Sequence, residues 1–238
     1  MNIEPIPETF LEFPKLARLS REAVVTEKID GTNSQVFVWD EMHDPLAQTD
    51  HGELHVPIGP PPAGVPFIWS AEGIHVAVGS RTKWITPADD NHGFAKWALA
   101  HVEELVYLGH GRHFGEWWGS GIQRGYGLTK GEKRLSLFNV TRWCLAGQTP
   151  QRISAPNAKV EKWQDVLPAC VGLVPVLYRG MFSTSEVDKT LQTLALTGSQ
   201  AAPGFMKPEG VVCWHTAANM GFKKTLEKDE TPKSLQSP

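Results

Sequence analysis

A tight glycine turn near the start of the chain separates two stretches that have the pattern of β-strands. Residues 23–26 are rich in β-branched side chains, and residues 34–39 alternate polar and apolar side chains as a half-buried strand does. Asp30 and Gly31 form a favourable turn pair between them. The pattern predicts a hairpin and therefore a fold that contains a sheet. It also places Lys28 at the end of a strand, where the backbone fixes the start of its side chain.

Most of the remaining chain has the pattern of strands, and two stretches have the pattern of helices. Apolar residues at helical spacing predict one helix over 94–108, which Gly109 ends, and a capping box at 183–186 begins a second helix, which Gly198 ends. Further strands are predicted over 74–78, 135–143, 171–178, 209–214 and 220–226. Pro175 places the strand over 171–178 near a sheet edge. The irregular alternation of helices and strands is typical of an α+β fold.

Composition limits the size of the fold and the kind of partner. The chain has 238 residues, of which 41% are hydrophobic and 21% are charged, so it can form one large domain or two small ones. We expect a single domain over 1–238, because only 14 residues follow Lys224. The formal net charge of -3 argues against a protein that coats nucleic acid non-specifically. Any contact with RNA or DNA must therefore be local.

The cysteines and the N-terminus indicate a cellular compartment. Cys144, Cys170 and Cys213 are odd in number, widely spaced and set among apolar residues, as expected of reduced thiols in a core. The N-terminus lacks a basic region followed by an apolar run, and no apolar segment approaches the ~18 residues that cross a bilayer. We therefore expect a cytoplasmic protein without membrane spans.

Lys28 has the position of a nucleophile, and the chain carries charged groups that could assist it. A free lysine has a pKa near ~10.4, so an attacking lysine needs cationic neighbours, a metal or desolvation to lose its proton. Arg81 and Lys83 follow the strand predicted over 74–78 much as Lys28 follows its own. Glu116 lies beside glycines, which suits close approach of a ligand to the backbone.

Five segments in this order resemble the motifs of covalent nucleotidyltransferases, the superfamily of polynucleotide ligases and mRNA capping enzymes. The resemblance is closest to the ATP-dependent RNA ligases, and it spans almost the whole chain. The segments are residues 26–33, 79–83, 114–116, 208–212 and the lysine-bearing strand at 220–226. The resemblance implies a single ATP-grasp-like nucleotidyltransferase domain without a separate OB-fold or accessory domain. In such a domain two mainly antiparallel sheets enclose a nucleotide cleft, with helices outside.

The resemblance also implies a reaction in which Lys28 attacks the α-phosphate of ATP, expels pyrophosphate and holds AMP through a phosphoramidate. AMP then passes to the 5′-phosphate of an RNA, and a 3′-hydroxyl displaces it to seal the strand, as in RNA repair. Because each step is a displacement at phosphorus, catalysis should depend on cations and positioning. The implied catalytic cations are Arg81, Lys223 and Lys224. Glu209 and Asp30 would hold Mg²⁺ or Mn²⁺ through oxygen ligands.

The nucleotide-binding residues implied by the resemblance come from every one of these segments. Glu116 would contact the ribose, Phe138 would stack on adenine, and Asn33 would orient the RNA end. The full set is Glu27, Lys28, Asp30, Gly31, Asn33, Arg81, Glu116, Phe138, Glu209, Lys223 and Lys224.

The chain departs from the family pattern at two of these positions. Family members carry two lysines separated by one residue in the last motif, whereas Lys223 and Lys224 are adjacent and should point to opposite faces of a strand. We expect Lys223 to reach the phosphate, because Phe222 and Leu226 share a face with Lys224 and have the character of core residues. The aromatic motif has Asn139 where the family pattern has aspartate.

Tryptophans offer a further candidate surface for bases. Trp117 or Trp118, which lie beside the glycine-rich stretch 119–127, could stack on a base of the nucleic acid.

Three other functions fit the same motifs. The core motifs are shared with DNA nick ligases and with GTP-dependent capping enzymes. A non-catalytic protein that binds nucleotide or RNA is the alternative from another class. A separate protein that delivers RNA or heals its ends could act as a partner.

Overall fold

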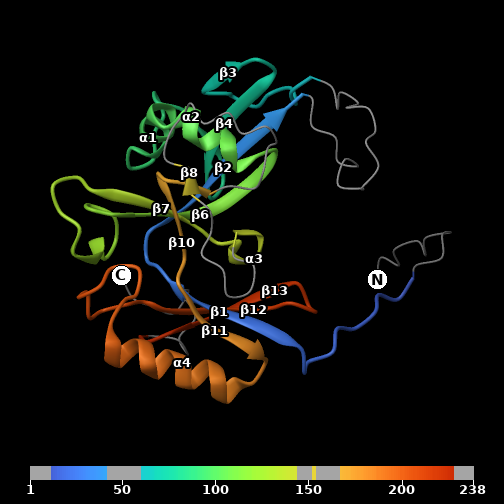
Figure 1. Cartoon of the computed structure of the whole chain (residues 1–238), viewed down its shortest axis with the longest axis vertical. Coiled ribbons are helices and arrows are strands. Elements are labelled where there is room, and N and C mark those ends of the chain that lie inside the picture. The colour runs from blue at the N-terminus through green and yellow to red at the C-terminus, as the bar shows by residue number, and fades with distance from the viewer. Residues whose placement is uncertain (1–11, 42–59, 144–151, 154–166, 228–238) are drawn as a thin grey trace, which may run out of the picture.

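The computed structural model describes residues 12–41, 60–143, 152–153 and 167–227, which form two main sheets (Figure 1). The small sheet has four antiparallel strands in the order β11 (Val176–Met181), β1 (Glu22–Lys28), β12 (Gly210–His215) and β13 (Met220–Thr225).

The large sheet has seven strands, six of them in the order β10 (Val171–Leu173), β7 (Lys133–Leu137), β6 (Gly111–Gly119), β2 (Thr32–Asp40), β4 (Ile74–Ser80) and β3 (Trp69–Ala71). The remaining strand, β5 (Trp84–Ile85), pairs with β4. All of these pairs are antiparallel except β10 with β7. A separate parallel pair joins β8 (Arg152–Ile153) to β9 (Leu167–Pro168). The predicted α+β class with two mainly antiparallel sheets is confirmed.

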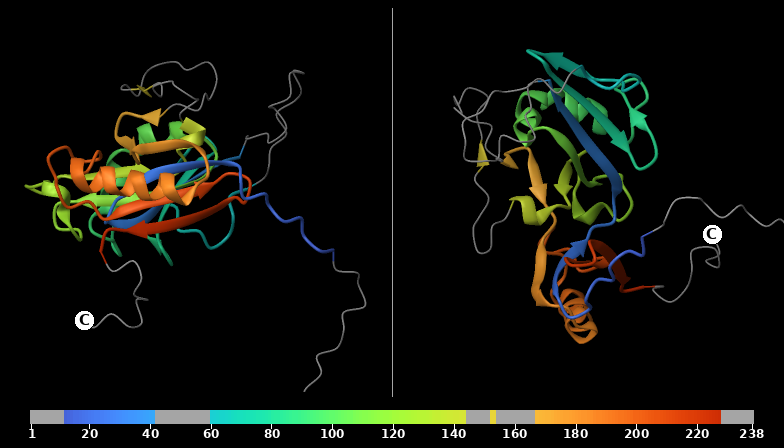
Figure 2. Two further views of the ribbon diagram at one scale, coloured as in Figure 1. Left: turned by 90° about the horizontal axis from the view of Figure 1, so that it is seen from below. Right: turned by 90° about the vertical axis from the view of Figure 1, so that its right-hand side faces the viewer.

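Helices flank both sheets (Figure 2). Two short helices, α1 (Phe94–Ala100) and α2 (Val102–Leu105), pack against one face of the large sheet and bury β2 and β4 side chains such as Val36 and Val78. The longest helix, α4 (Thr184–Thr197), buries Leu191 and Leu194 against one face of the small sheet. The other elements are the 3-10 turns η1 (Val106–Leu108) and η2 (Gly125–Gly127) and the short helix α3 (Val140–Trp143).

The predicted hairpin at Lys28 is wrong, because β1 and β2 belong to different sheets. β1 pairs with β11 and β12, whereas β2 pairs with β4 and β6. The turn between them therefore connects the two sheets, and its backbone is held by distant segments. A Cβ atom on Gly31 would lie 2.5 Å from the carbonyl oxygen of Trp117, so only glycine fits there. Turn residues alone cannot reveal which strands pair across long distances in the sequence.

Three other elements differ from their predicted bounds. The strand expected over 135–143 ends at Leu137, because the Asn139 side chain accepts a hydrogen bond from the Arg142 N–H (3.1 Å) and begins helix α3. The stretch 171–178 is two strands, β10 and β11, on either side of Pro175, and each lies at an edge of a different sheet. The helix expected over 94–108 is interrupted at His101, whose backbone is not helical.

The second helix agrees with its prediction. The Ser183 hydroxyl accepts from the Glu186 N–H (3.4 Å) at the start of α4, and Gly198 follows its last turn. Cys170 and Cys213 are free thiols, while Cys144 lies outside the described residues. Within the described ranges, no helix has the length and apolar character needed to cross a membrane.

Candidate active site

Lys28 and Glu209 form an ion pair where β1 ends and β12 begins, next to the turn. Lys28 Nζ donates to Glu209 Oε2 at 2.5 Å, and the two side chains are 25% and 18% exposed. The register explains the pairing, since Lys28 lies opposite Gly210 and Glu209 immediately precedes that glycine. Two motifs that are 181 residues apart in the chain thus meet at one point. Partial burial makes such a pair stronger than one on an open surface.

Glu116 closes the other side of the turn. Its Oε1 accepts from the Gly31 N–H (3.1 Å) and its Oε2 accepts from Asn33 Nδ2 (2.9 Å). Burial raises the pKa of Glu116 to about 7, against the opposing effects of the Gly31 hydrogen bond and the Lys28 charge. The antiparallel pairing of Asn33 with Glu116 brings both side chains to the same face of the large sheet. A carboxyl that is about half ionised near pH 7 can accept a hydrogen bond from a hydroxyl ligand or donate one to it.

Arg124 and Tyr126 were not among the predicted site residues, yet both hold the turn. Arg124 Nε donates to Asp30 Oδ2 (3.1 Å), and its guanidinium also contacts Glu227 (3.4 Å). The Tyr126 hydroxyl accepts from the Asp30 N–H (2.9 Å) and donates to the Lys28 carbonyl (3.5 Å). The signal in the sequence is an arginine and a tyrosine within a run of glycines, a composition common to many loops. Asp30, a predicted metal ligand, is therefore engaged with Arg124 in this structure.

Glu27 points away from Lys28, because neighbouring residues on a strand face opposite sides. Its side chain is 1% exposed, and its Oε2 accepts from the backbone N–H groups of Gln200 (2.8 Å) and Ala201 (3.0 Å). Its other oxygen, Oε1, is buried and has no hydrogen-bond partner among the described residues. A buried acceptor without a donor is costly, and this one lies on the face of β1 that packs toward α4, opposite to the face of Lys28.

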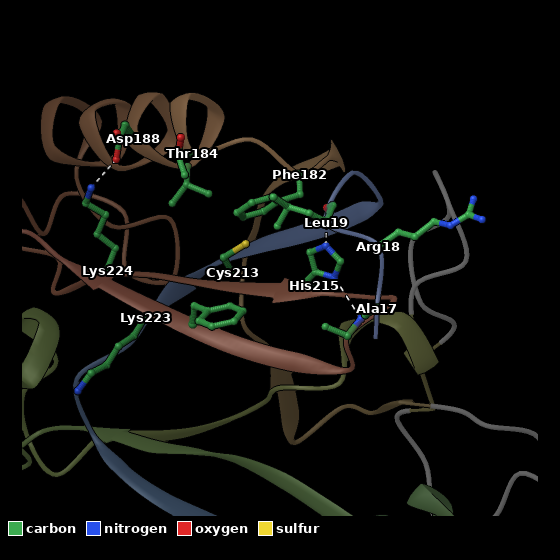
Figure 3. Close-up of a pocket in the computed structure, with 13 residues that line it drawn as sticks. Ala17, Arg18, Leu19, Phe182, Thr184, Asp188, Cys213, His215, Lys223 and Lys224 are labelled. Atoms are coloured by element: carbon green, nitrogen blue, oxygen red, sulfur yellow. Dashed lines mark hydrogen bonds and ion pairs between the residues drawn. The ribbon is translucent and has the colours of Figure 1, made fainter. Parts of the chain in front are cut away.

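Lys223 and Lys224 point to opposite faces of β13, as the sequence predicts (Figure 3). Lys224 Nζ reaches Asp188 on α4 at 2.5 Å. Lys223 is exposed and pairs with Val212, which pairs with Thr26 on β1. Lys28 is two residues after Thr26 on the same strand, so Lys223 and Lys28 lie on the same face of the small sheet. The expectation that Phe222 and Leu226 are core residues is wrong, because they are 53% and 37% exposed. It is α4, packed over the opposite face, that directs Lys224 away.

The remaining predicted residues lie on the large sheet. Arg81 is exposed and directly follows Ser80, the last residue of β4, which pairs with Ser34 near the start of β2. Phe138 directly follows β7 and is 42% exposed. Trp117 and Trp118 are each only 2% exposed, so neither presents a ring to a base. That prediction was wrong because both side chains pack into hydrophobic clusters.

The described residues contain no group of three or more His, Cys, Asp and Glu side chains arranged to hold a metal ion. Mg²⁺ commonly takes one or two carboxylates and completes its shell with water and phosphate oxygens. Glu209 fits that limited role, since it is a partly exposed carboxylate beside the candidate nucleophile. The donor chemistry at the turn is thus compatible with a hard divalent ion shared with a phosphate ligand.

Comparison with known proteins decides the family. A family model described as RNA ligase matches residues 21–228, which include every segment described above. The chain belongs to the RNA ligase family. No protein with a curated function matches its sequence.

Solved structures of another RNA ligase are similar to this family member at low identity. A glutamate-to-alanine mutant of the Naegleria gruberi RNA ligase with ATP and Mn is 18% identical with a TM-score of 0.47, over 88% of this chain and 51% of that one. A lysine-to-methionine mutant of the same ligase with AMP and Mn is 17% identical with a TM-score of 0.44, over 87% and 50%. The chain thus spans about half the length of these proteins.

Proposed function

We propose that this RNA ligase family member is an ATP-dependent RNA ligase that joins a 3′-hydroxyl and a 5′-phosphate through an AMP held on Lys28. The observation that supports the proposal best is the meeting of Lys28, Glu209 and Glu116 around one turn between the two sheets. These three groups come from three separate motifs of the resemblance. The family match supports the nucleic-acid substrate class.

The proposed reaction consists of three displacements at phosphorus. Lys28 Nζ attacks the α-phosphorus of ATP, a P–N bond forms, and the bond to the β-phosphate breaks to release pyrophosphate. The 5′-phosphate of RNA then attacks the same phosphorus, which breaks the P–N bond and leaves AMP on the RNA. Finally the 3′-hydroxyl attacks the RNA phosphorus, loses its proton and expels AMP.

Charged side chains of the chain have defined tasks in this scheme. The Lys28 ammonium must lose a proton before it attacks, and a divalent ion bound at Glu209 would displace Lys28 Nζ from Oε2 and free the amine from its ion pair. Lys223, on the same face as Lys28, and Arg81, at the end of the large sheet, would neutralise charge on the phosphate oxygens. Glu116 would accept a hydrogen bond from the ribose.

A divalent ion would bind at Glu209 in this proposal. Mg²⁺ or Mn²⁺, when bound, neutralises charge on phosphate oxygens and makes phosphorus easier to attack. Asp30 is a weaker candidate ligand than Glu209, because its carboxylate already pairs with Arg124. Removal of the ion with a chelator should therefore stop the attachment of AMP to the protein.

A strand-joining assay tests the proposed function. A single-stranded oligoribonucleotide with a labelled 5′-phosphate and a 3′-hydroxyl is incubated with the full chain, Mg²⁺ and either ATP or GTP, and DNA ends serve as the alternative substrate. We expect sealed RNA with ATP, and none with Lys28→Ala. Sealing of DNA alone, or transfer of GMP, would favour the nick-ligase or capping alternatives. ATP binding without pyrophosphate release would favour the non-catalytic alternative. A need for an added protein that delivers RNA or heals its ends would identify a partner.

A further inference from the structure

One face of the large sheet is not covered by helices α1 and α2, and it carries two exposed phenylalanines side by side. The Phe138 N–H donates to the Phe114 carbonyl (2.9 Å), one step beyond the pairing of Gly115 with Leu137. The two rings therefore project from adjacent strand positions on the same face. Phe114 is 53% exposed and Phe138 is 42% exposed. Large apolar side chains that stay exposed together usually mark a binding surface.

The same row of the sheet continues across two more strands. Phe114 pairs with Gln35, and Gln35 pairs with Gly79, which pairs with Trp84. The next row toward the turn holds Glu116 and Asn33. Alternate residues on a strand are about 7 Å apart, so the aromatic row lies one such step from the residues that hold the Lys28 turn. We call Gln35, Trp84, Phe114 and Phe138, together with Arg112 from the neighbouring row, the aromatic row.

Arg112 gives this surface a positive charge in a fixed orientation. Its guanidinium lies over the rings of Phe37 (4.5 Å) and Trp84 (5.0 Å), and its Nη1 donates to Gln35 Oε1 (3.1 Å). No carboxylate pairs with Arg112 in the part of the chain that the structure describes, and the same holds for Arg81. A stacked guanidinium keeps several N–H donors for a phosphate and loses little rotamer freedom when it binds one.

We propose that the aromatic row binds the unpaired end of an RNA strand, with a base stacked on Phe114 and a phosphate on Arg112. The inference rests on the proposed function, because the row leads directly to the Lys28 turn. Exposed rings and cations without carboxylate partners are complementary to bases and phosphates, which is the chemistry of single-stranded nucleic acid. A base inside a duplex is already stacked on both of its faces, so an unpaired base is the better partner for Phe114. If Phe138 stacks on the adenine of AMP, the base on Phe114 lies next to it.

Direct binding of RNA tests this surface. A fluorescently labelled single-stranded oligoribonucleotide is titrated with the full chain without ATP, and the affinity is measured by anisotropy. If one base stacks on Phe114, Phe114→Ala should weaken binding by about 5- to 150-fold. Phe114→Trp, which keeps an aromatic face, should bind at least as tightly as wild type. Phe222→Ala is the matched control, since Phe222 is also 53% exposed but lies on the α4 side of the small sheet.

Salt dependence tests the phosphate contact separately. For Arg112→Gln, the slope of log affinity against log salt concentration should fall by about 0.7, the contribution of one phosphate contact on a single strand. An unchanged slope would overturn the assignment of a phosphate to Arg112. Phe114→Ala should leave this slope unchanged, because a ring carries no charge.

Two further outcomes would overturn the stacking surface. One is binding of RNA by Phe114→Ala as tight as that of Phe222→Ala. The other is a change in self-association, rather than in RNA affinity, when Phe114 is replaced. Formation of the AMP adduct, measured in parallel by mass, separates this inference from the proposed function. Loss of RNA binding with a normal adduct supports the surface, whereas RNA binding through Phe114 without any adduct would refute only the ligase proposal.

Discussion

At the residue scale, the two lysines of β13 offer a direct comparison between neighbours of the same type. Lys223 shares a face with Lys28, whereas Lys224 is paired with Asp188 on α4. We predict that Lys223→Ala slows formation of the lysyl-AMP adduct by about 100-fold, as expected when a cation that stabilises phosphate charge is removed. Lys224→Ala should slow it by less than about 3-fold and change stability by at most about 1 kcal/mol, the contribution of an exposed ion pair. Equal effects of the two variants on the rate would contradict the assignment.

Glu116 makes the stability of the fold depend on pH. Its pKa rises from 4.5 to about 7 on folding, so the folded state binds more protons than the unfolded state between these values. Stability therefore falls as pH rises through this window, and the penalty is complete above about pH 7. Glu116→Gln removes this contribution of Glu116 to the pH dependence of stability. The difference in melting temperature, variant minus wild type, should be larger at pH 8 than at pH 5 by at least about 3 °C. A difference that stays constant with pH would show that Glu116 does not titrate there.

At the scale of elements, the glycine-rich loop holds the turn that carries Lys28. The Tyr126 hydroxyl accepts the Asp30 N–H, and its ring packs against Trp118 and Phe205 (centroids at 5.3 and 4.7 Å). Tyr126→Phe keeps the ring packing but leaves a backbone donor unpaired. We predict a loss of about 1–3 kcal/mol in the free energy of unfolding, measured in urea. The same variant should slow adduct formation, because the turn loses one of its supports, and a rate equal to wild type would contradict this role.

The sequence predicts elements better than it predicts their partners. The α4 helix is specified locally by Ser183 and Gly198, so its bounds could be read from the chain. The end of β7 depends on Asn139, whose capping role can be recognised only when the following turn is known to be helical. The pairing of β1 with β12 depends on residues far along the chain, which no local pattern encodes. For that reason the Lys28 turn was predicted as a hairpin although it joins two sheets.

In the candidate site, too, the sequence identifies some residues but not the contacts that they make. Lys28, Glu116 and Glu209 could be selected from ordered motifs, and the structure brings them together around the turn. The contact between Asp30 and Arg124 could not be predicted, because it depends on how the glycine-rich loop folds back. Exposure also needs the structure: Trp117 and Trp118 are buried, whereas Phe114 two positions before Glu116 is open.

At the scale of the whole molecule, the site lies where the chain crosses between the two sheets. One crossing runs from Lys28 to Thr32, and the other runs from Leu173 to Val176 through Pro175, whose carbonyl accepts the Glu27 N–H (2.9 Å). The small sheet supplies Lys28, Glu209 and Lys223, and the large sheet supplies Glu116, Asn33 and Arg81. A ligand bound at the turn would therefore contact both sheets at once.

The central claim is that Lys28 becomes covalently attached to AMP. Intact-protein mass spectrometry of the full chain, after incubation with ATP and Mg²⁺, measures this directly, and peptide mapping locates the adduct. The account predicts one added AMP on wild type, located at Lys28, and no adduct on Lys28→Ala. An unmodified wild-type protein, or an undiminished adduct on Lys28→Ala, would contradict it.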